Sequence, residues 1–148
     1  MEHTHFPRFY RDWLSDNPLI ASELWRRAFE SGVCAEQNGD ADAALRSGLV
    51  AQEVAELLLL NQPNIGDCAF ARILNSSLLV IRLLRASGNH KHVRAQVGRT
   101  LGALSKSGAL GAPRHTVIKA CERLLSAMEQ EPEGGKMMKE RLESVALH

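Results

Sequence analysis

Two pairs of closely spaced histidines are the best candidates for metal ligands in this sequence. His3 and His5, and likewise His90 and His92, are separated by a single residue. Such a pair can share one metal ion when the backbone is extended, whereas on a helix the two side chains diverge. Neither pair has an evident third ligand nearby, and we expect surface or helix-capping roles for these histidines. The sequence therefore predicts no metal site and no cofactor.

The cysteines offer little more chemistry. Cys34, Cys68 and Cys121 form neither a disulfide framework nor a closely spaced pair. Each falls among the apolar residues of a predicted helix, where a free cysteine usually packs as a small hydrophobic side chain. A cysteine nucleophile needs a neighbouring histidine, and His115 lies six residues from Cys121, too far along one helix for a hydrogen bond.

Acid–base and phosphate-binding patterns are also weak. Glu53 and Glu56 have helical spacing, and we expect both to be solvated on a polar helix face. A phosphate-binding loop needs closely spaced glycines after a strand. That spacing is absent from Gly98, Gly102, Gly108 and Gly111. Gly98 and Gly102, four residues apart inside a predicted helix, predict a close approach of another helix instead. Together these patterns predict a protein that is not an enzyme.

Length and composition restrict the class of protein. The chain has 148 residues, of which 45% are hydrophobic and 24% charged, which suits one folded domain and argues against disorder. The longest uninterrupted apolar run is Leu57–Leu60, too short to span a membrane. Residues 1–10 lack the apolar stretch of a secretory signal. We therefore expect a cytoplasmic protein without a membrane partner.

Turn-forming residues divide the chain into segments of helical length. The alternation of a half-buried strand is absent, so the sequence predicts an all-α fold of six to seven helices. Apolar residues at three- and four-residue steps predict antiparallel helical hairpins, and an up-down bundle fits the same pattern. Residues 1–16 form an arm or a short helix, and residues 17–148 form a single helical-repeat domain. The expected hairpins cover about residues 17–61, 67–106 and 113–147.

The helix ends are marked by specific residues. Asn17 followed by Pro18 predicts a capped helix start, and Asp40 predicts another. Gly39, Gly88 and Gly135 each stand at the tight turn of a predicted hairpin, 49 and 47 residues apart. This near-constant separation predicts three similar units, with the longer loops, Asn61–Asn64 and Ser107–Gly111, between them.

Small residues and a tight turn mark residues 25–58. Gly32 stands midway along the first predicted helix of this stretch, and Gly39-Asp40 forms the turn to the second helix. Ala44 and Ala51 stand seven residues apart in that second helix. In these features residues 25–58 resemble a tetratricopeptide repeat. Small residues at these positions let two helix axes cross closely.

The same stretch departs from the family in several places. Ala28 replaces a large residue, Ala35 a tyrosine and Gly48 an aromatic residue, and Glu56 stands where the repeat is closed by proline. Beyond residue 58 the likeness is one of topology.

The resemblance implies a tetratricopeptide-like α-solenoid that serves as a scaffold, adaptor, chaperone-like or regulatory module. Members of this family bind a peptide or helix of a partner protein on the concave face formed by the first helix of each pair. The residues expected on that face are Arg26, Phe29, Val33, Glu36, Gln37, Asn75, Leu78, Arg82 and Arg85.

Charge is divided unevenly along the chain. Residues 1–66 carry a net charge of −5, residues 67–130 carry +7 and residues 131–148 carry −1. The basic segment 67–130 would attract any anion. The alternative prediction is therefore that the protein is an anion- or nucleic-acid-binding regulator. Since no aromatic residues alternate with the basic ones, nucleic acid is the less favoured partner. The opposite charges of the two parts also make a homo-oligomer such as a dimer plausible.

Overall fold

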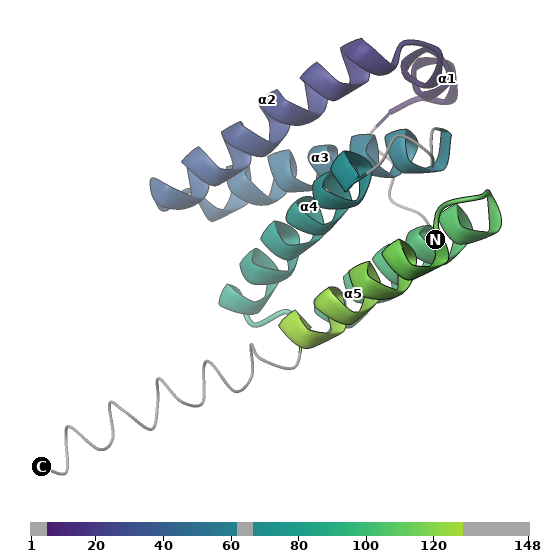
Figure 1. The fold of residues 1–148 in the computed structure, drawn as a ribbon. Helices are drawn as coiled ribbons and strands as arrows, with labels where there is room; N and C mark the ends of the chain where they lie inside the picture. Colours follow the sequence, from purple (N-terminus) through teal and green to yellow (C-terminus); the bar gives the residue numbers. More distant parts are fainter. Residues whose placement is uncertain (1–5, 62–66, 129–148) are drawn as a thin grey trace, which may run out of the picture.

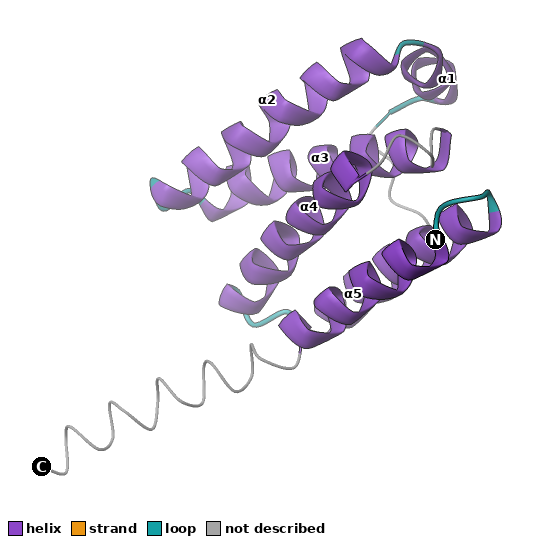
Figure 2. Cartoon of the chain, in the orientation of Figure 1, coloured by secondary structure: helices purple, strands orange, loops and turns teal. Residues whose placement is uncertain are grey.

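The chain is all-helical over the residues that the structure describes. The structure is a computed structural model that describes residues 6–61 and 67–128. Its labelled helices are α1 (Arg8–Asp16), α2 (Pro18–Gln37), α3 (Ala41–Asn61), α4 (Asp67–Ala86) and α5 (His90–Ala109), followed by helical residues 114–128 (Figure 2). The predicted fold class is therefore confirmed. Gly135, the pair His3 and His5 and the second half of the third expected hairpin lie outside the described residues.

Consecutive helices pack against each other as a stack of hairpins (Figure 1). Helices α2 and α3 form the first hairpin and α4 and α5 the second, with α3 packed against α4 between them. At one end, α1 lies against α2 and α3. At the other end of the stack lies the helix of residues 114–128 (Figure 1). The two ends of the stack therefore belong to opposite ends of the described chain.

Both hairpin turns have the same backbone geometry. Gly39 and Gly88 each have φ +79°, in the left-handed region that favours glycine. After Gly39 the N–H of Asp40 donates to the carbonyl of Ala35 at 2.9 Å, and after Gly88 the N–H of Asn89 donates to Leu84 at 2.9 Å. These bonds close the last turn of each helix in the same way.

A third turn of this kind ends α5, where the sequence predicts none. Gly111 has φ +111°, and the next N–H, of Ala112, donates to the carbonyl of Ser107 at 3.0 Å. Helix α5 continues through Ala109, so the expected loop from Ser107 is wrong at its start. The side chain of Ser107 is buried and donates to the carbonyl of Leu104 at 2.6 Å, which keeps this residue in the helix.

The two predicted helix starts differ. The carboxylate of Asp40 accepts a hydrogen bond from the N–H of Ala43 at 3.2 Å, so it caps α3 as expected. The side chain of Asn17 makes no capping bond to α2, and its amide donates instead to the carbonyl of Trp13 at 2.8 Å. Pro18 nevertheless occupies the first helical position. Asn17 thus joins α1 to α2 instead of capping α2.

Small residues bring α2, α3 and α4 close together. A Cβ added to Gly32 would lie 3.1 Å from Leu79 Cδ2 and 3.4 Å from the carbonyl oxygen of Ala44, and one added to Gly48 would lie 3.2 Å from Val80 Cγ2. The close packing expected at Gly32 is confirmed, and Gly48 is approached as closely. At Gly98 and Gly102 the same expectation is wrong, because an added Cβ would meet nothing within 4 Å and both residues are exposed.

Candidate functional site

Helices α2 and α4 carry the nine residues expected to bind a partner, and the structure places these helices in contact. The indole Nε1 of Trp25 on α2 donates to Ser76 Oγ on α4 at 2.7 Å. The residues of the predicted face therefore belong to adjoining helices, as the sequence predicts. Their individual contacts decide how much of this face is available to a partner.

Arg82 and Glu36 join the two helices by a bidentate ion pair. Arg82 Nε and Nη2 each donate to an oxygen of the Glu36 carboxylate at 2.8 Å. The side chain of Arg82 is half exposed, whereas that of Glu36 is mostly covered. The guanidinium holds the pKa of Glu36 below its ordinary value. This pair spans the predicted face and ties α2 to α4.

Arg26 is engaged within its own helix. Its guanidinium pairs with Glu23 and, at 2.8 Å, with Glu30, one turn to either side. Arg27 also pairs with Glu23, at 3.1 Å. Hydrogen bonds from both arginines lower the pKa of Glu23 to about 2, and Glu23 and Glu30 raise the pKa of Arg26. The outer surface of α2 is therefore charged and internally balanced.

The apolar members of the predicted face are partly buried. Phe29 stacks on Trp25, with ring centroids 5.1 Å apart, and both Phe29 and Val33 pack against a small core that contains Leu79. Leu78 is half-buried against the main core. Only parts of these side chains remain available to a partner.

The remaining members lie at the edges of the face. Gln37 and Asn75 are exposed, whereas Arg85 donates from Nη2 to the carbonyl oxygen of Met128 at 2.9 Å. Arg85 thus ties α4 to the helix of residues 114–128. Most of the nine residues hold helices together, so substitution of Arg82 or Arg85 would disturb the fold as well as any partner.

Four large apolar side chains are exposed on α1 and the first turn of α2. Leu19 is 86% exposed and Phe9 75% exposed, and Trp13 and Ile20 are each exposed by nearly half. We call these four residues the N-terminal apolar surface. None of these four residues is among the nine that the sequence analysis expects to bind a partner. The missed signal is two adjacent large apolar residues in a first helical turn, outside the buried stripe of α2.

Helix α1 is held in place on its opposite side. Leu14 is 1% exposed and forms a core cluster with Ala21, Val54 and Leu58. Tyr10 stacks on Trp13, with ring centroids 5.8 Å apart. The exposed side chains of α1 are therefore presented by an anchored helix.

Exposed apolar side chains occur again near the other end of the stack. Ile118 and Leu125 lie seven residues apart on the helix of residues 114–128, and Leu110 lies in the turn before it. Seven residues are two helical turns, so Ile118 and Leu125 share a face. We call these two residues the C-terminal apolar face. The same helix contacts the main core through Val117, Ala120 and Leu124.

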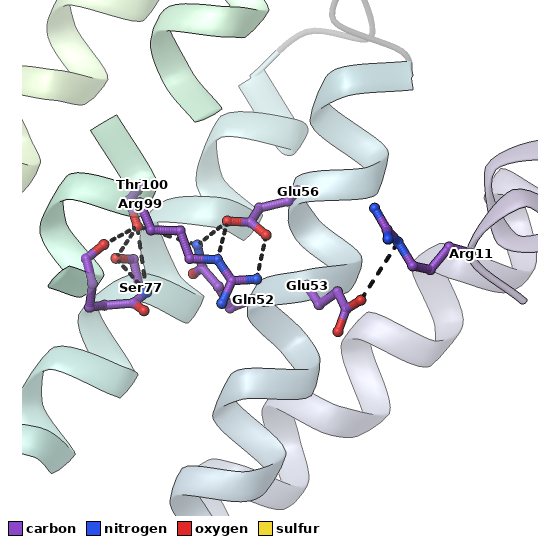
Figure 3. Close-up of polar contacts among 8 residues, drawn as sticks. Arg11, Gln52, Glu53, Glu56, Ser77, Arg99 and Thr100 are labelled. Carbon is purple, nitrogen blue, oxygen red and sulfur yellow. Dashed lines mark hydrogen bonds and ion pairs between the residues drawn. The ribbon is translucent and has the colours of Figure 1, made fainter. Parts of the chain in front are cut away.

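Polar side chains form a buried network where α3, α4 and α5 meet (Figure 3). Thr100 Oγ1 lies 2.7 Å from Ser77 Oγ and accepts from Gln52 Nε2 at 3.3 Å. Gln96 Nε2 donates to Ser77 Oγ at 3.3 Å. All four residues are at most 6% exposed, and Gln52 Oε1 has no hydrogen-bond partner. Because the network is enclosed, it positions helices and offers no access to a substrate.

Glu53 and Glu56 are not solvated, contrary to the sequence-based expectation. The Glu56 carboxylate accepts from Arg99 Nε at 2.7 Å and from Arg99 Nη2 at 2.6 Å, next to the network (Figure 3). Glu53 is 3% exposed, with Oε2 lying 3.8 Å from Arg11 Nε. Glu53 and Glu56 lie on one helix, as their spacing predicts. However, α3 is a central helix, and even its polar side is covered by α1 and α5.

Two of the three cysteines differ from their expected positions, and Cys121 agrees with its own. Cys34 and Cys68 are exposed, because they lie on the sides of α2 and α4 that face away from the core. Cys121 is half-buried against the core, and burial raises the pKa of its thiol. His115 is exposed, and its ring lies 3.5 Å from Thr116 Oγ1. A raised pKa makes the Cys121 thiol less ready to form a thiolate.

No group of three or more potential metal ligands occurs in residues 6–61 and 67–128. A recess between α1, α2 and α3, lined by Leu14, Pro18 and Leu57 among others, is too small for a water molecule. Among the helices of the described residues, none combines the length and apolar character that crossing a bilayer requires.

The chain was compared with protein families, curated proteins and solved structures. No family model, curated protein or solved structure matches the chain. The functional argument therefore rests on the exposed surfaces described above.

Proposed function

We propose that this chain is a non-enzymatic protein-interaction module that binds an apolar helix or peptide of a partner protein. The observation that supports the proposal is the N-terminal apolar surface. Leu19 and Phe9 are mostly exposed, although burying side chains of this size stabilises a protein by about 2 kcal/mol each. Exposed groups of large apolar side chains typically mark protein-interaction sites.

The form of the surface fits a helical partner. Phe9 and Trp13 lie one turn apart on α1, and Leu19 and Ile20 begin α2 just beyond the turn. Aromatic residues with few rotatable bonds are effective anchors in interfaces. In this proposal the tetratricopeptide-like hairpin of α2 and α3 is the framework that presents the surface. The α2–α4 face, through exposed Asn75 and Gln37, is the edge along which a longer peptide continues.

The test compares variants of both surfaces. Phe9→Gln combined with Leu19→Gln removes the apolar anchors, and Asn75→Lys combined with Gln37→Lys changes the α2–α4 face. Ala95→Gln, an exposed position on α5, is the matched control. Tagged proteins are used to capture partners from cell lysate, and bound proteins are quantified by mass spectrometry.

We expect a protein captured by the wild type and the Ala95 control to be lost with the Phe9/Leu19 variant. Loss only with the Asn75/Gln37 variant would move the binding site to the α2–α4 face. Capture that is unchanged by both variants would refute the proposed sites.

A second candidate function is anion binding, and the surface of α5 favours it. Lys91, Arg94 and Lys106 are exposed there, and none forms an ion pair with an acidic residue among the described residues. An anion bound by these groups would be released by salt. Fluorescence anisotropy with a labelled single-stranded oligonucleotide, repeated at increasing salt, tests this function. Binding that is absent at low salt would eliminate nucleic acid as the ligand.

A further inference from the structure

Helix α1 packs over an apolar part of α2 and α3. Ala21 on α2 and Val54 and Leu58 on α3 lie under it, and all three are buried. Of the nine residues of α1, Leu14 alone is buried, in contact with this cluster. We call Ala21, Val54, Leu58 and the neighbouring Glu53 the covered surface. A single fully buried side chain therefore anchors α1 to the covered surface.

Several features make α1 a weak helix by itself. It has nine residues, whereas isolated helices shorter than about 12–15 residues are marginal in water. Its N-cap residue, Pro7, makes no side-chain capping bond. Arg8 begins the helix and Asp16 ends it, so both terminal charges oppose the helix dipole. Helix α1 therefore depends on its contact with the covered surface.

One residue links α1 to α2. Helix α1 ends at Asp16 and α2 begins at Pro18, which leaves Asn17 between them. The carbonyl of Asn17 accepts from the N–H of Ala21 at 3.0 Å, so it belongs to the first turn of α2. Because proline does not fit inside a continuous helix, α1 and α2 do not merge. Rotation of the backbone before this carbonyl can thus release α1 while α2 keeps its first turn.

The polar contacts of α1 include a carboxylate of the covered surface. Arg11 Nε lies 3.8 Å from Glu53 Oε2, a separation too long for a hydrogen bond (Figure 3). Glu53 is 3% exposed, so its carboxylate lies beneath α1 next to apolar side chains. Near the solvent, Asn61 Nδ2 donates to Ser15 Oγ at 3.0 Å. The covered surface therefore favours a helix with an apolar residue for the cluster and a basic residue for the carboxylate.

We propose that α1 is a displaceable cover, and that the covered surface binds an amphipathic helix of a partner protein in its place. The contacts of α1 define that helix: a large apolar residue as at Leu14, a basic residue three positions before it as at Arg11, and an aromatic residue as at Tyr10. Amphipathic helices commonly bind through their apolar face. The site lies beneath α1, so the inference goes beyond the proposed function at the N-terminal apolar surface.

In the closed protein α1 competes with the partner helix for the covered surface. A segment tethered through a short link has an effective concentration in the millimolar range. A partner helix therefore binds weakly until α1 is loosened, and a change that weakens the contact of α1 should strengthen partner binding. The same competition makes the proposal testable with a peptide that has the sequence of α1.

The test measures binding of a fluorescently labelled peptide of residues 6–17 to the purified full chain by fluorescence anisotropy. Two variants of the chain loosen α1. Leu14→Ala removes its anchor, and Asp12→Pro breaks its helix at an exposed position without removing a buried side chain. Leu124→Ala, at a buried leucine in the helix of residues 114–128, is the matched control for general destabilisation. Circular dichroism verifies that each variant keeps the helical fold.

The proposal predicts that peptide binding increases when α1 is loosened. The Leu14→Ala and Asp12→Pro chains should bind the peptide about tenfold or more tightly than the wild type, because the competing segment is weakened. The Leu124→Ala chain should bind as the wild type does. A peptide that itself carries Leu14→Ala should lose binding to every chain. If the Leu14→Ala chain fails to fold, the Asp12→Pro chain decides the result.

A second set of variants tests the carboxylate. Glu53→Gln is combined with Asp12→Pro in the chain, and Arg11→Gln is introduced into the peptide. Either change alone should weaken binding by about threefold to fivefold, and the two together should weaken it little more than one does. Losses that multiply would show that Arg11 and Glu53 do not interact in the complex, and they would contradict the predicted chemistry of the partner helix.

Three other results would overturn the proposal. Equal peptide binding by the wild type and both α1 variants would mean that α1 does not compete for the covered surface. An equal gain with Leu124→Ala would attribute binding to a general loosening of the fold. A wild-type dimer that sedimentation velocity detects, and that Leu14→Ala abolishes, would mean that α1 of a second copy fills the covered surface.

The peptide experiment fails or succeeds separately from the test of the proposed function. The Phe9/Leu19 variant keeps Leu14 and Glu53, so loss of a captured protein with that variant supports the N-terminal apolar surface whatever the peptide shows. Peptide binding that is gained with Asp12→Pro supports the covered surface even if no protein is captured from lysate.

Discussion

The two hairpins share one turn geometry but are held together differently. In the first hairpin, Gly32 and Gly48 bring α2 and α3 close to each other and to Leu79 of α4. In the second, α5 meets α3 and α4 through the buried hydrogen bonds of Ser77, Gln96 and Thr100. The first interface depends on the absence of side-chain volume, and the second adds buried hydrogen bonds to apolar packing, so the two should respond to different substitutions.

The largest effect is expected from filling the close approach in the first hairpin. Gly32→Leu places a side chain where even a Cβ would be 3.1 Å from Leu79 Cδ2. Overpacking of this kind should lower the free energy of unfolding by about 3 kcal/mol. Urea denaturation followed by circular dichroism measures it.

Gly98→Leu is the matched control in α5. An added Cβ there meets nothing within 4 Å, and leucine is the better helix former, so stability should rise by up to about 1 kcal/mol. Equal destabilisation by both substitutions would contradict the distinction between the hairpins.

These glycines also show what the sequence could reveal. Positions 32, 48, 98 and 102 look alike in the sequence, since each is a glycine inside a predicted helix. Whether another helix approaches depends on which side of the stack the residue faces, and that follows only from the packing of all helices. The turns at Gly39 and Gly88 were predictable because a left-handed helix end is a local requirement.

The candidate site was less predictable for the same reason. The sequence placed the residues of the α2–α4 face on the correct helices, but Arg82 and Glu36 are 46 positions apart, and their pairing depends on tertiary contact. Leu19 stands in the first turn of α2, outside its buried stripe, and this position was the one local sign of its exposure. Glu53 was expected in solvent because the sequence does not show that α1 covers α3.

The second expected effect concerns the polar interface of α5. Thr100→Val keeps the shape of the side chain but removes the hydroxyl that accepts from Gln52, contacts Ser77 and donates to the Gln96 carbonyl at 3.0 Å. Leaving these buried groups without their bonds should cost about 2 kcal/mol of unfolding free energy.

Thr116→Val, near the surface of the helix of residues 114–128, is the control for this substitution and should change stability by less than about 0.5 kcal/mol. Chemical denaturation of both proteins compares them. If the Thr100 variant were as stable as the control, hydrogen bonding would not be what holds α5.

A smaller effect is expected for the ion pair beside the network. Arg99→Met leaves the mostly buried Glu56 carboxylate without its bidentate partner and should cost about 1 kcal/mol. Arg94→Met removes an exposed arginine from the same helix and should have little effect. Thermal unfolding of the two variants in parallel measures the difference, and similar melting temperatures would show that the pair adds nothing to the second hairpin.

The smallest effect concerns the contact between the hairpins at Glu36. Arg82 depresses the pKa of Glu36 in the folded protein, so this ion pair adds stability above the ordinary glutamate pKa and loses it as the pH falls through the depressed value. Arg82→Gln should return the pKa of Glu36 toward its ordinary value. It should also flatten the acid side of the stability profile, with no change expected near pH 7 in the slope of stability against pH.

Carboxyl chemical shifts followed by NMR during an acid titration measure this pKa directly, and Arg46→Gln on the exposed side of α3 is the control. A Glu36 pKa that stays depressed in the Arg82 variant would mean that another group holds the carboxylate. A pKa that rises only in that variant would establish the ion pair in solution. The α2–α4 face would then be a structural contact between helices. Partner binding would be assigned to the exposed apolar side chains at the ends of the stack.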